Sequence, residues 1–275
     1  MIESFFFIPG SHPKLIEKLA TIKADYLIID LEDAVLKTNI FSILETLKEI
    51  DNIQNIWIRL VLFEDNKEKF ATFKELLNQG FRNFIIPKIR NLNQLKSIES
   101  FIGNSILNEV KTIILVENPE CLLNLNDLIV NASVKIEGVG FGSQDYCSET
   151  GMKHTLDYLK IPRFQIMNTA KAHKVKSIDI ACMDSKAGQI FSNELKEAFE
   201  MGYDGKFLIH PAQLERLKGT RFYTKEEVSE AASILDKYKR LQKPAVFVYN
   251  DRVIEPPHIK YFHNIINWSK KYEAK

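Results

Sequence analysis

Residues 111–117 read KTIILVE, a run of apolar and β-branched side chains that ends in a carboxylate. A continuous apolar run of this length predicts a strand buried on both faces, as in a parallel sheet. Glu117 then stands at the carboxyl end of the strand, where parallel α/β folds place their chemistry. A second predicted strand, 136–141, is followed closely by Asp145. We expect these two acids, at the ends of successive strands, to point into one mouth.

Length and composition indicate an ordinary globular chain of 275 residues, 45% hydrophobic and 27% charged. Its net charge of +1 provides no global field for nucleic acid or an anionic membrane, so neither is expected as a partner. The cysteines Cys121, Cys147 and Cys182 form no CxxC pair, which favours free thiols in a reducing compartment. The first residues lack the basic and apolar regions of a signal peptide, so we expect a cytoplasmic protein.

Strand-length apolar runs alternate with helical patterns along the chain. Such alternation indicates βαβ units, and eight units closing on themselves make a TIM barrel. We therefore predict a (β/α)8 barrel over residues 1–222 and a lid or oligomerisation extension over 223–275. The predicted strands are 4–8, 26–29, 56–58, 84–86, 111–117, 136–141, 177–181 and 206–209. The predicted helices between them are 11–23, 39–50, 67–78, 91–101, 120–131, 163–174 and 189–201. In the extension we expect helices 225–241 and 259–271 around a hairpin of 245–249 and 253–254.

Polar residues stand at or just beyond every predicted strand end. In chain order they are Pro9, Gly10 and Ser11; Asp30, Glu32 and Asp33; Arg59; Lys88; Glu117; Asp145; Asp184; and His210. An acid after a strand is often a helix N-cap, an alternative that applies to Asp33 and Asp184. Lys88 has the alternative of a solvated charge, and His210 that of a structural histidine.

Three of these residues are harder to explain by structure alone. A guanidinium at a strand end, as at Arg59, requires an anionic partner. Glu117 and Asp145 together supply two hard oxygen ligands, which suit Mg²⁺ when water and substrate complete its coordination. The sequence therefore predicts a magnesium site beside an anion-binding arginine.

Several motifs in the same order as these strand ends carry a family resemblance. The chain resembles the citrate lyase beta subunit family, within the HpcH/HpaI aldolase superfamily, over essentially its whole length. The segments are FFFIPGSHP at 5–13, DLEDAV at 30–35, IIPKI at 85–89, LVENPE at 115–120, GFGSQDY at 140–146, GYDGKFLIHPAQL at 202–214 and DRVIEPP at 251–257. DLEDAV and the GYDGK…IHP run are the most specific.

The resemblance implies a Mg²⁺-dependent lyase or aldolase that cleaves or forms a carbon–carbon bond next to a thioester, such as citryl-, malyl- or citramalyl-CoA. It also implies a homotrimer or hexamer, an oxoacid partner and a CoA or acyl-carrier thioester. Glu117 and Asp145 match the metal-binding acids, and Arg59 matches an arginine that grips the substrate carboxylate.

The remaining roles follow from the chemistry of the reaction. Lys88 and Glu117 are expected to bind substrate, and backbone N–H groups near Pro9 and Gly10 to stabilise the enolate oxygen. The three acids of the DLEDAV motif are Asp30, Glu32 and Asp33. We expect them to hold metal-bound waters or to orient Arg59 and Lys88. Glu255, in the extension, is expected to complete the site when a lid closes over the mouth of a barrel.

Departures from the family pattern weaken a direct transfer of substrate. Leu60-Val61 follows Arg59 where the family often has Ile-Asn, and Gln144 replaces a glutamate before the metal aspartate. Other departures are Glu3 and Gln165 in place of arginines, and Glu255 in place of an aspartate. Two alternatives therefore stay open: a low-activity subunit of a carrier-protein citrate lyase complex, or an aldolase acting on free oxoacids without CoA.

Overall fold

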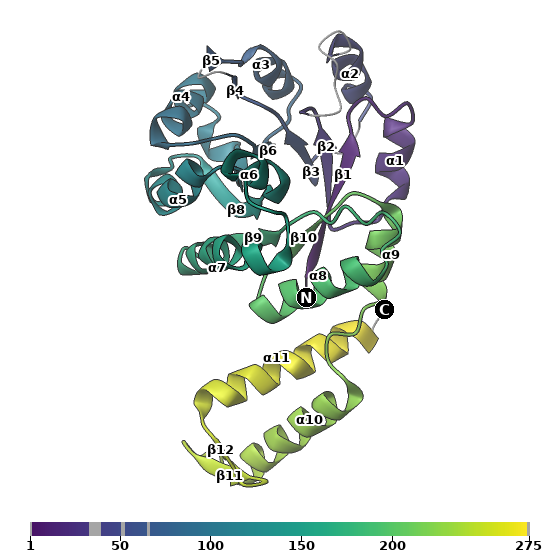
Figure 1. Ribbon diagram of the computed structural model, residues 1–275, viewed down its shortest axis with the longest axis vertical. Coiled ribbons are helices and arrows are strands. Elements are labelled where there is room, and N and C mark those ends of the chain that lie inside the picture. The colour runs from purple at the N-terminus through teal and green to yellow at the C-terminus, as the bar shows by residue number, and fades with distance from the viewer. Residues whose placement is uncertain (1, 33–39, 51–52, 65–66, 274–275) are drawn as a thin grey trace. The chain divides into compact units, whose positions relative to one another are not determined.

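The structure is a computed structural model that describes residues 2–32, 40–50, 53–64 and 67–273 (Figure 1). The chain forms two compact units, Ile2–Lys218 and Gly219–Lys275. None of the helices in the described ranges is both long and apolar enough to cross a membrane.

The first unit is a closed barrel of parallel strands, which confirms the predicted TIM-type architecture (Figure 1). Around the barrel the order is β1-β10-β9-β8-β7-β6-β3-β2, and β1 closes the ring by pairing with both β10 and β2. All carboxyl ends therefore meet at one mouth. The strands are β1 (Glu3–Pro9), β2 (Tyr26–Asp30), β3 (Ile56–Arg59), β6 (Asn83–Ile86), β7 (Lys111–Val116), β8 (Lys135–Phe141), β9 (Lys176–Asp179) and β10 (Gly205–Leu208).

Helices surround these strands. They are α1 (Leu15–Thr21), α2 (Ile40–Leu47), α3 (Ala71–Asn78), α4 (Leu92–Ile102), α5 (Pro119–Asn131), α6 (Ser143–Thr150), α7 (Leu156–Ala172), α8 (Gln189–Met201) and α9 (Pro211–Gly219), with a short 3-10 helix at Leu107–Glu109. Two begin on asparagine N-caps: the Asn91 side chain accepts from the N–H of Gln94, and that of Asn118 from the N–H of Cys121. Capping fixes where α4 and α5 begin after their strands.

Four local predictions were wrong. The helix expected at 11–23 spans only Leu15–Thr21. The helix expected at 67–78 begins only at Ala71, because β4 (Phe63–Glu64) and β5 (Lys67–Glu68) pair as an antiparallel hairpin. α7 begins at Leu156 rather than 163 and continues through Pro162, although proline removes one helical hydrogen bond. Helices α6 and α9 were not predicted, and α6 carries Asp145.

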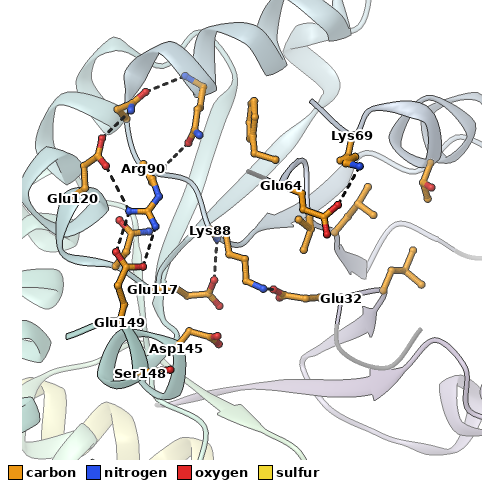
Figure 2. A pocket seen from close by; sticks show the side chains of 18 of the residues that line it. Glu32, Glu64, Lys69, Lys88, Arg90, Glu117, Glu120, Asp145, Ser148 and Glu149 are labelled. Carbon is orange, nitrogen blue, oxygen red and sulfur yellow. Dashed lines mark hydrogen bonds and ion pairs between the residues drawn. The ribbon is translucent and has the colours of Figure 1, made fainter. Parts of the chain in front are cut away.

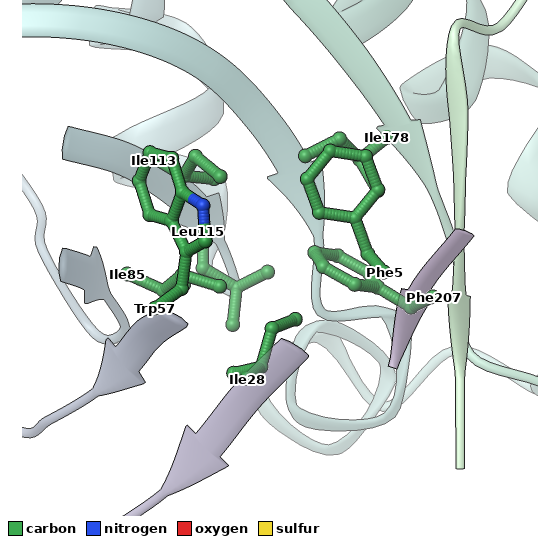
Figure 3. Packing of buried hydrophobic residues seen from close by; sticks show 8 residues of the cluster. All are labelled: Phe5, Ile28, Trp57, Ile85, Ile113, Leu115, Ile178 and Phe207. Carbon is green, nitrogen blue, oxygen red and sulfur yellow. The ribbon is translucent and has the colours of Figure 1, made fainter. Parts of the chain in front are cut away.

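Alternate residues of the strands fill the barrel interior (Figure 3). The cluster comprises Phe5, Ile28, Trp57, Ile85, Ile113, Leu115, Ile178 and Phe207. Two glycines make room for the phenylalanines, since a Cβ at Gly205 would lie 2.5 Å from the Phe5 ring and one at Gly140 would lie 2.5 Å from the Phe207 ring. The interior is thus a packed core below the mouth.

Side chains that alternate with this core face the helices and form a buried ion network. Asp179 accepts two hydrogen bonds from Arg163, at 2.9 Å from Nε and 3.0 Å from Nη2. Lys206 Nζ lies 3.3 Å from Asp179 Oδ2 and 3.2 Å from Glu194 Oε2. Burial opposes the charge of Arg163, but Asp179 and Glu197 raise the pKa of the guanidinium further above its usual range.

The GYDGK motif therefore has a structural role. Its lysine, Lys206, belongs to this network, and its tyrosine, Tyr203, donates from its hydroxyl to the Arg163 carbonyl oxygen at 2.7 Å. Asp204 Oδ2 accepts from the N–H and the hydroxyl of Ser177, at 2.9 and 3.0 Å. These contacts join β9, β10 and α7.

The second unit contains α10 (Lys225–Arg240), β11 (Phe247–Tyr249), β12 (Arg252–Ile254) and α11 (Pro256–Glu273). Thr224 and Glu227 form a capping box at the start of α10. The predicted hairpin is confirmed, with Val248 opposite Val253. Its turn residues Asn250 and Asp251 have φ values of 44° and 59°, a region that Asn and Asp tolerate better than most residues. The units divide at 218/219, near the predicted 222/223, and the lid role of the second unit stays a prediction.

Candidate active site at the carboxyl ends of the strands

A cleft of about 1260 Å³ opens at the carboxyl ends of the strands (Figure 2). Its charged lining residues are Glu32, Glu64, Lys69, Lys88, Arg90, Glu117, Glu120, Asp145 and Glu149. Apolar lining comes from Leu31, Ile40, Leu60, Val61 and Phe63. Several of the polar strand-end residues predicted from the sequence thus meet in one cleft.

Asp30 and Arg59 anchor one side of this mouth. They lie directly opposite each other on β2 and β3, and Arg59 Nε and Nη2 donate to the two Asp30 carboxylate oxygens at 2.8 and 2.6 Å. Arg59 Nη1 lies 3.2 Å from Glu32 Oε2, and the Phe7 ring lies under the guanidinium, with its centroid 4.9 Å from Cζ. The Arg59 side chain is only 13% exposed, so its position is fixed by these contacts.

Lys88 links this cluster to the acid at the end of β7. Its φ of 56° is an uncommon backbone conformation for a residue with a side chain. Lys88 Nζ lies 2.7 Å from Glu32 Oε1, and its backbone N–H donates to Glu117 Oε2 at 2.9 Å. Partial burial opposes the ammonium charge, but the hydrogen bond and charge of Glu32, with the charges of Glu117 and Asp145, raise the pKa of Lys88.

Glu117 is the most deeply buried acid of the site, with a relative exposure of 2%. Burial, followed by the charges of Glu32 and Asp145, raises the pKa of this carboxyl well above its usual range. Its Oε1 atom has no hydrogen-bond partner among the described residues. Gly142 leaves the room for this carboxyl group, because a Cβ there would lie 2.7 Å from Oε1.

Asp145 lies in the first turn of α6, and its side chain is exposed toward the same space (Figure 2). Among the described residues, no three His, Cys, Asp or Glu side chains cluster so as to hold a metal ion. Glu117 and Asp145 nevertheless fit a divalent cation that takes its other ligands from water and substrate. The two carboxylates repel each other, and Glu117 Oε1 has no hydrogen bond from the described residues. The donor set is of the hard-oxygen type that Mg²⁺ prefers.

The structure does not bring every predicted residue into this cleft. Asp30 and Arg59 end their strands beside it, but neither is among its lining residues. Pro9 has no N–H, and Gly10 donates its own to the Asp30 carbonyl oxygen at 2.8 Å, so these two residues do not supply the expected enolate donors. Asp33 lies outside the described residues. Glu255 belongs to the second unit, where it is exposed and its N–H donates to His258 Nδ1 at 3.1 Å at the start of α11.

Two further strand-end residues have structural roles, although Asp184 is not the helix N-cap that was considered, since Gly188 occupies that position of α8. Asp184 accepts from the N–H groups of Lys186 and Gly188, at 3.1 and 2.8 Å, which orders the loop before α8. His210 Nδ1 accepts from the N–H of Ala212 at 3.2 Å, at the beginning of α9.

Sequence reasoning missed the ionic rim of the cleft. Arg90 makes two hydrogen bonds of 3.0 Å to the Glu149 carboxylate and lies 3.6 Å from Glu120 (Figure 2). Arg90 directly follows the IIPKI segment, a position that could have drawn attention to it. Glu149 had no such signal, because the helix that carries it was not predicted.

Comparison with known proteins identifies the family of this chain and several relatives. The sequence profile described as HpcH/HpaI aldolase/citrate lyase matches residues 3–211. A (3S)-malyl-CoA thioesterase of Cereibacter sphaeroides is 25% identical over 93% of this chain and 90% of its own length. The mitochondrial citramalyl-CoA lyase of Rattus norvegicus is also 25% identical, over 98% of this chain and 86% of its own.

The same fold occurs in the protein CitE from Mycobacterium tuberculosis, solved in complex with magnesium, acetoacetate and coenzyme A. The similarity covers 97% of each chain with a TM-score of 0.82 and 17% sequence identity. At this identity the likeness is one of fold. The resemblance drawn from the sequence motifs is confirmed by the profile match.

Proposed function

The chain belongs to the HpcH/HpaI aldolase/citrate lyase family, and from this premise we propose that it is a Mg²⁺-dependent carbon–carbon lyase acting on a 3-hydroxy-acid thioester. The observation that carries the proposal is the buried Oε1 atom of Glu117, which has no hydrogen-bond partner in the part of the chain that the structure describes and lies in one cleft with Asp145. The relatives named malyl-CoA thioesterase and citramalyl-CoA lyase support a hydroxyacyl thioester as the substrate class.

Glu117 and Asp145 would hold the cation. A bound Mg²⁺ would lower the pKa of a coordinated substrate hydroxyl and polarise the adjacent carboxylate. The carboxylate of Glu117 suits this role, because its Oε2 atom accepts a hydrogen bond from the Lys88 N–H. Its Oε1 atom has no hydrogen-bond partner among the described residues and could ligate the cation.

In the cleavage direction, the substrate hydroxyl gives its proton to solvent, which later returns one to the enolate, and the hydroxyl-bearing carbon becomes the carbonyl of an oxoacid. The bond between the hydroxyl-bearing carbon and the carbon next to the thioester breaks, and its electron pair forms an enolate that is then protonated at carbon. Arg59 would bind the acid's carboxylate, since Asp30 and Glu32 hold its guanidinium in a fixed orientation. Lys88 would supply a second positive charge at the fragment.

The charge of the cleft lining indicates which part of the thioester could enter it. Its described lining carries six carboxylates, at Glu32, Glu64, Glu117, Glu120, Asp145 and Glu149, against three cations, at Lys69, Lys88 and Arg90. A polyanionic nucleotide is disfavoured inside such a cleft, whereas a neutral pantetheine arm is not. This arm is common to CoA and acyl-carrier proteins, so the observation keeps a carrier-protein complex as the second candidate.

The assembly follows from the same premise. We propose a homo-oligomer, a trimer or hexamer, in which the second unit closes a barrel mouth and brings the Glu255 carboxylate to the site. The supporting observation is the exposure of Glu255 at the beginning of α11, directly after the hairpin β11–β12.

The test is a turnover screen of malyl-, citramalyl- and citryl-CoA with the full chain and Mg²⁺, in which oxoacid and acetyl-thioester are quantified. Detection of free thiol in the same reactions reports a thioesterase step separately. We expect EDTA to abolish cleavage, Glu117→Gln to lose it, and Glu215→Gln, an exposed acid on α9 outside the cleft lining, to retain it. Folded protein that cleaves none of the three thioesters would overturn the proposal.

A further inference from the structure

The cleft has a chemically distinct side, formed by the segments that follow β2 and β3. Leu31 comes directly after Asp30, and Leu60 and Val61 come directly after Arg59. Phe63, at the start of β4, and Ile40, at the start of α2, extend this apolar side. Leu31, Leu60 and Phe63 are each 7% exposed, so the surface is packed. We call these five residues the apolar wall.

Each cation that lines the cleft in the described ranges is already close to a carboxylate (Figure 2). Lys69 Nζ lies 3.1 Å from Glu64, Lys88 Nζ lies 2.7 Å from Glu32, and Arg90 Nη2 lies 3.0 Å from Glu149. A second substrate carboxylate would have to compete for one of these cations with the acid already paired with it, and the first, at Arg59, would share the guanidinium with Asp30 and Glu32.

The apolar wall begins beside the anchored arginine. The acid fragment of the substrate carries a carboxylate, a hydroxyl and one further substituent on the same carbon. We place this carboxylate at Arg59, as in the proposed function, and the further substituent against the apolar wall that lines the cleft on the side of β2 and β3. An alkyl group gains from burial there, whereas a carboxylate would lose its hydration without gaining a donor from the five side chains of the wall.

From these contacts, and resting on the proposed function, we propose that the site selects hydroxy acids whose third substituent is a short alkyl group. The oxoacid released is then an alkyl 2-oxo monocarboxylic acid and not a dicarboxylic one, and Val61 is the residue that sets this choice. Val61 is half-buried in the cleft lining, so a change there alters the wall without emptying the core.

The test compares the full chain, with Mg²⁺, on thioesters that differ only in this substituent: hydrogen in malyl-CoA, methyl in citramalyl-CoA and carboxymethyl in citryl-CoA. We expect kcat/KM for the methyl compound to exceed that for the carboxymethyl compound by about 100-fold or more, as for a site that leaves a polar group unpaired. The methyl compound should exceed the hydrogen compound about fourfold, the effect of one buried carbon.

Variants at the wall provide the second arm. Val61→Lys should raise the citryl-to-citramalyl ratio of kcat/KM at least about tenfold, since it adds an unpaired ammonium. Val61→Thr, nearly isosteric, should lower the preference for methyl and guards against misfolding of the lysine variant. Val130→Lys, on the outer face of α5, is the matched control and should leave the ratio unchanged.

Calorimetric binding of 2-oxobutyrate and oxaloacetate in Mg²⁺ separates the two proposals, because it does not need turnover. Tighter binding of 2-oxobutyrate without cleavage of any thioester would support the wall and overturn the proposed lyase function. Equal or better cleavage of citryl-CoA, or equal binding of oxaloacetate, would overturn the wall and leave the lyase function standing. Neither cleavage nor binding would overturn both.

Discussion

Asp30 and Arg59, 29 residues apart in the chain, lie opposite each other on adjacent parallel strands and share two hydrogen bonds of 2.8 and 2.6 Å. Their side chains are 10% and 13% exposed, which makes this a largely buried, bidentate ion pair at the barrel mouth. Such a pair fixes the plane of the guanidinium as well as its position. The orientation that the guanidinium would present to a substrate carboxylate is therefore set by this pair.

Arg59→Lys should keep the fold and lose most activity. Lysine retains the charge but not the planar, bidentate geometry, so we expect a loss of about 2 kcal/mol or more of transition-state binding. In kcat/KM this corresponds to about 30-fold. Arg240→Lys, in the exposed pair with Asp236 on α10, is the matched control. Activity of Arg59→Lys within twofold of wild type would show that Arg59 does not bind the substrate.

Glu117→Gln should weaken Mg²⁺ binding by about tenfold or more, because ligand charge governs the affinity of oxygen sites. The same change should stabilise the metal-free protein, since it removes a buried charge that Glu32 and Asp145 repel. Calorimetric titration of Mg²⁺ and thermal unfolding in EDTA measure the two effects. Glu215→Gln, at an exposed position of α9, should change neither. Equal Mg²⁺ affinity in Glu117→Gln and wild type would remove Glu117 from the metal site.

The apparent affinity for Mg²⁺ should rise with pH above the ordinary pKa of a glutamate. Burial and the neighbouring acids raise the pKa of Glu117, so the folded metal-free protein binds its proton more tightly than the unfolded chain. Stability without metal then falls as pH rises through the window between the two pKa values. The cation requires the ionised carboxylate, so binding strengthens over the same window. The Mg²⁺-induced shift in Tm, measured against pH, should show this slope in wild type and lose it in Glu117→Gln.

Lys206→Met should lower the free energy of unfolding by about 3 to 5 kcal/mol, the usual cost of removing one partner from a buried ion pair. The change leaves Asp179 and Glu194 without the ammonium that lies 3.3 and 3.2 Å from them. Chemical denaturation measures the loss, with Lys196→Met on the exposed face of α8 as control. Protein that remains folded should keep its KM, and a selective loss of substrate affinity would contradict the structural role assigned to Lys206.

Glu255→Ala should lower kcat more than it raises KM if its carboxylate acts when the lid closes. The backbone N–H that bonds to His258 is retained, so α11 should begin as before. Glu226→Ala, another exposed acid near the start of a helix, is the control. Unchanged turnover in Glu255→Ala would show that Glu255 is a solvated turn residue without a role in the reaction.

The barrel could be predicted because its signals are local. Each strand is an apolar run that needs no knowledge of its neighbours, and helix α8 was predicted with its observed bounds, Gln189–Met201. Helix α6, SQDYCSET, is short and polar, and its formation depends on its position after β8 rather than on its own periodicity. The hairpin β4–β5 was missed for the same reason, since two-residue strands carry no pattern.

By itself, the sequence determined the order of the eight barrel strands and hence the barrel, the mouth at which the strand-end residues gather, and the hairpin at Asn250 and Asp251. Only the tertiary structure decided what those residues contact. It engages the Gly10 N–H with Asp30, places Lys206 of GYDGK in a buried ion network, and leaves Glu117 Oε1 without a hydrogen bond from the described residues. The physical reason is that these are contacts between residues distant in sequence. Partners, burial and the resulting pKa shifts arise only when separate strands come together.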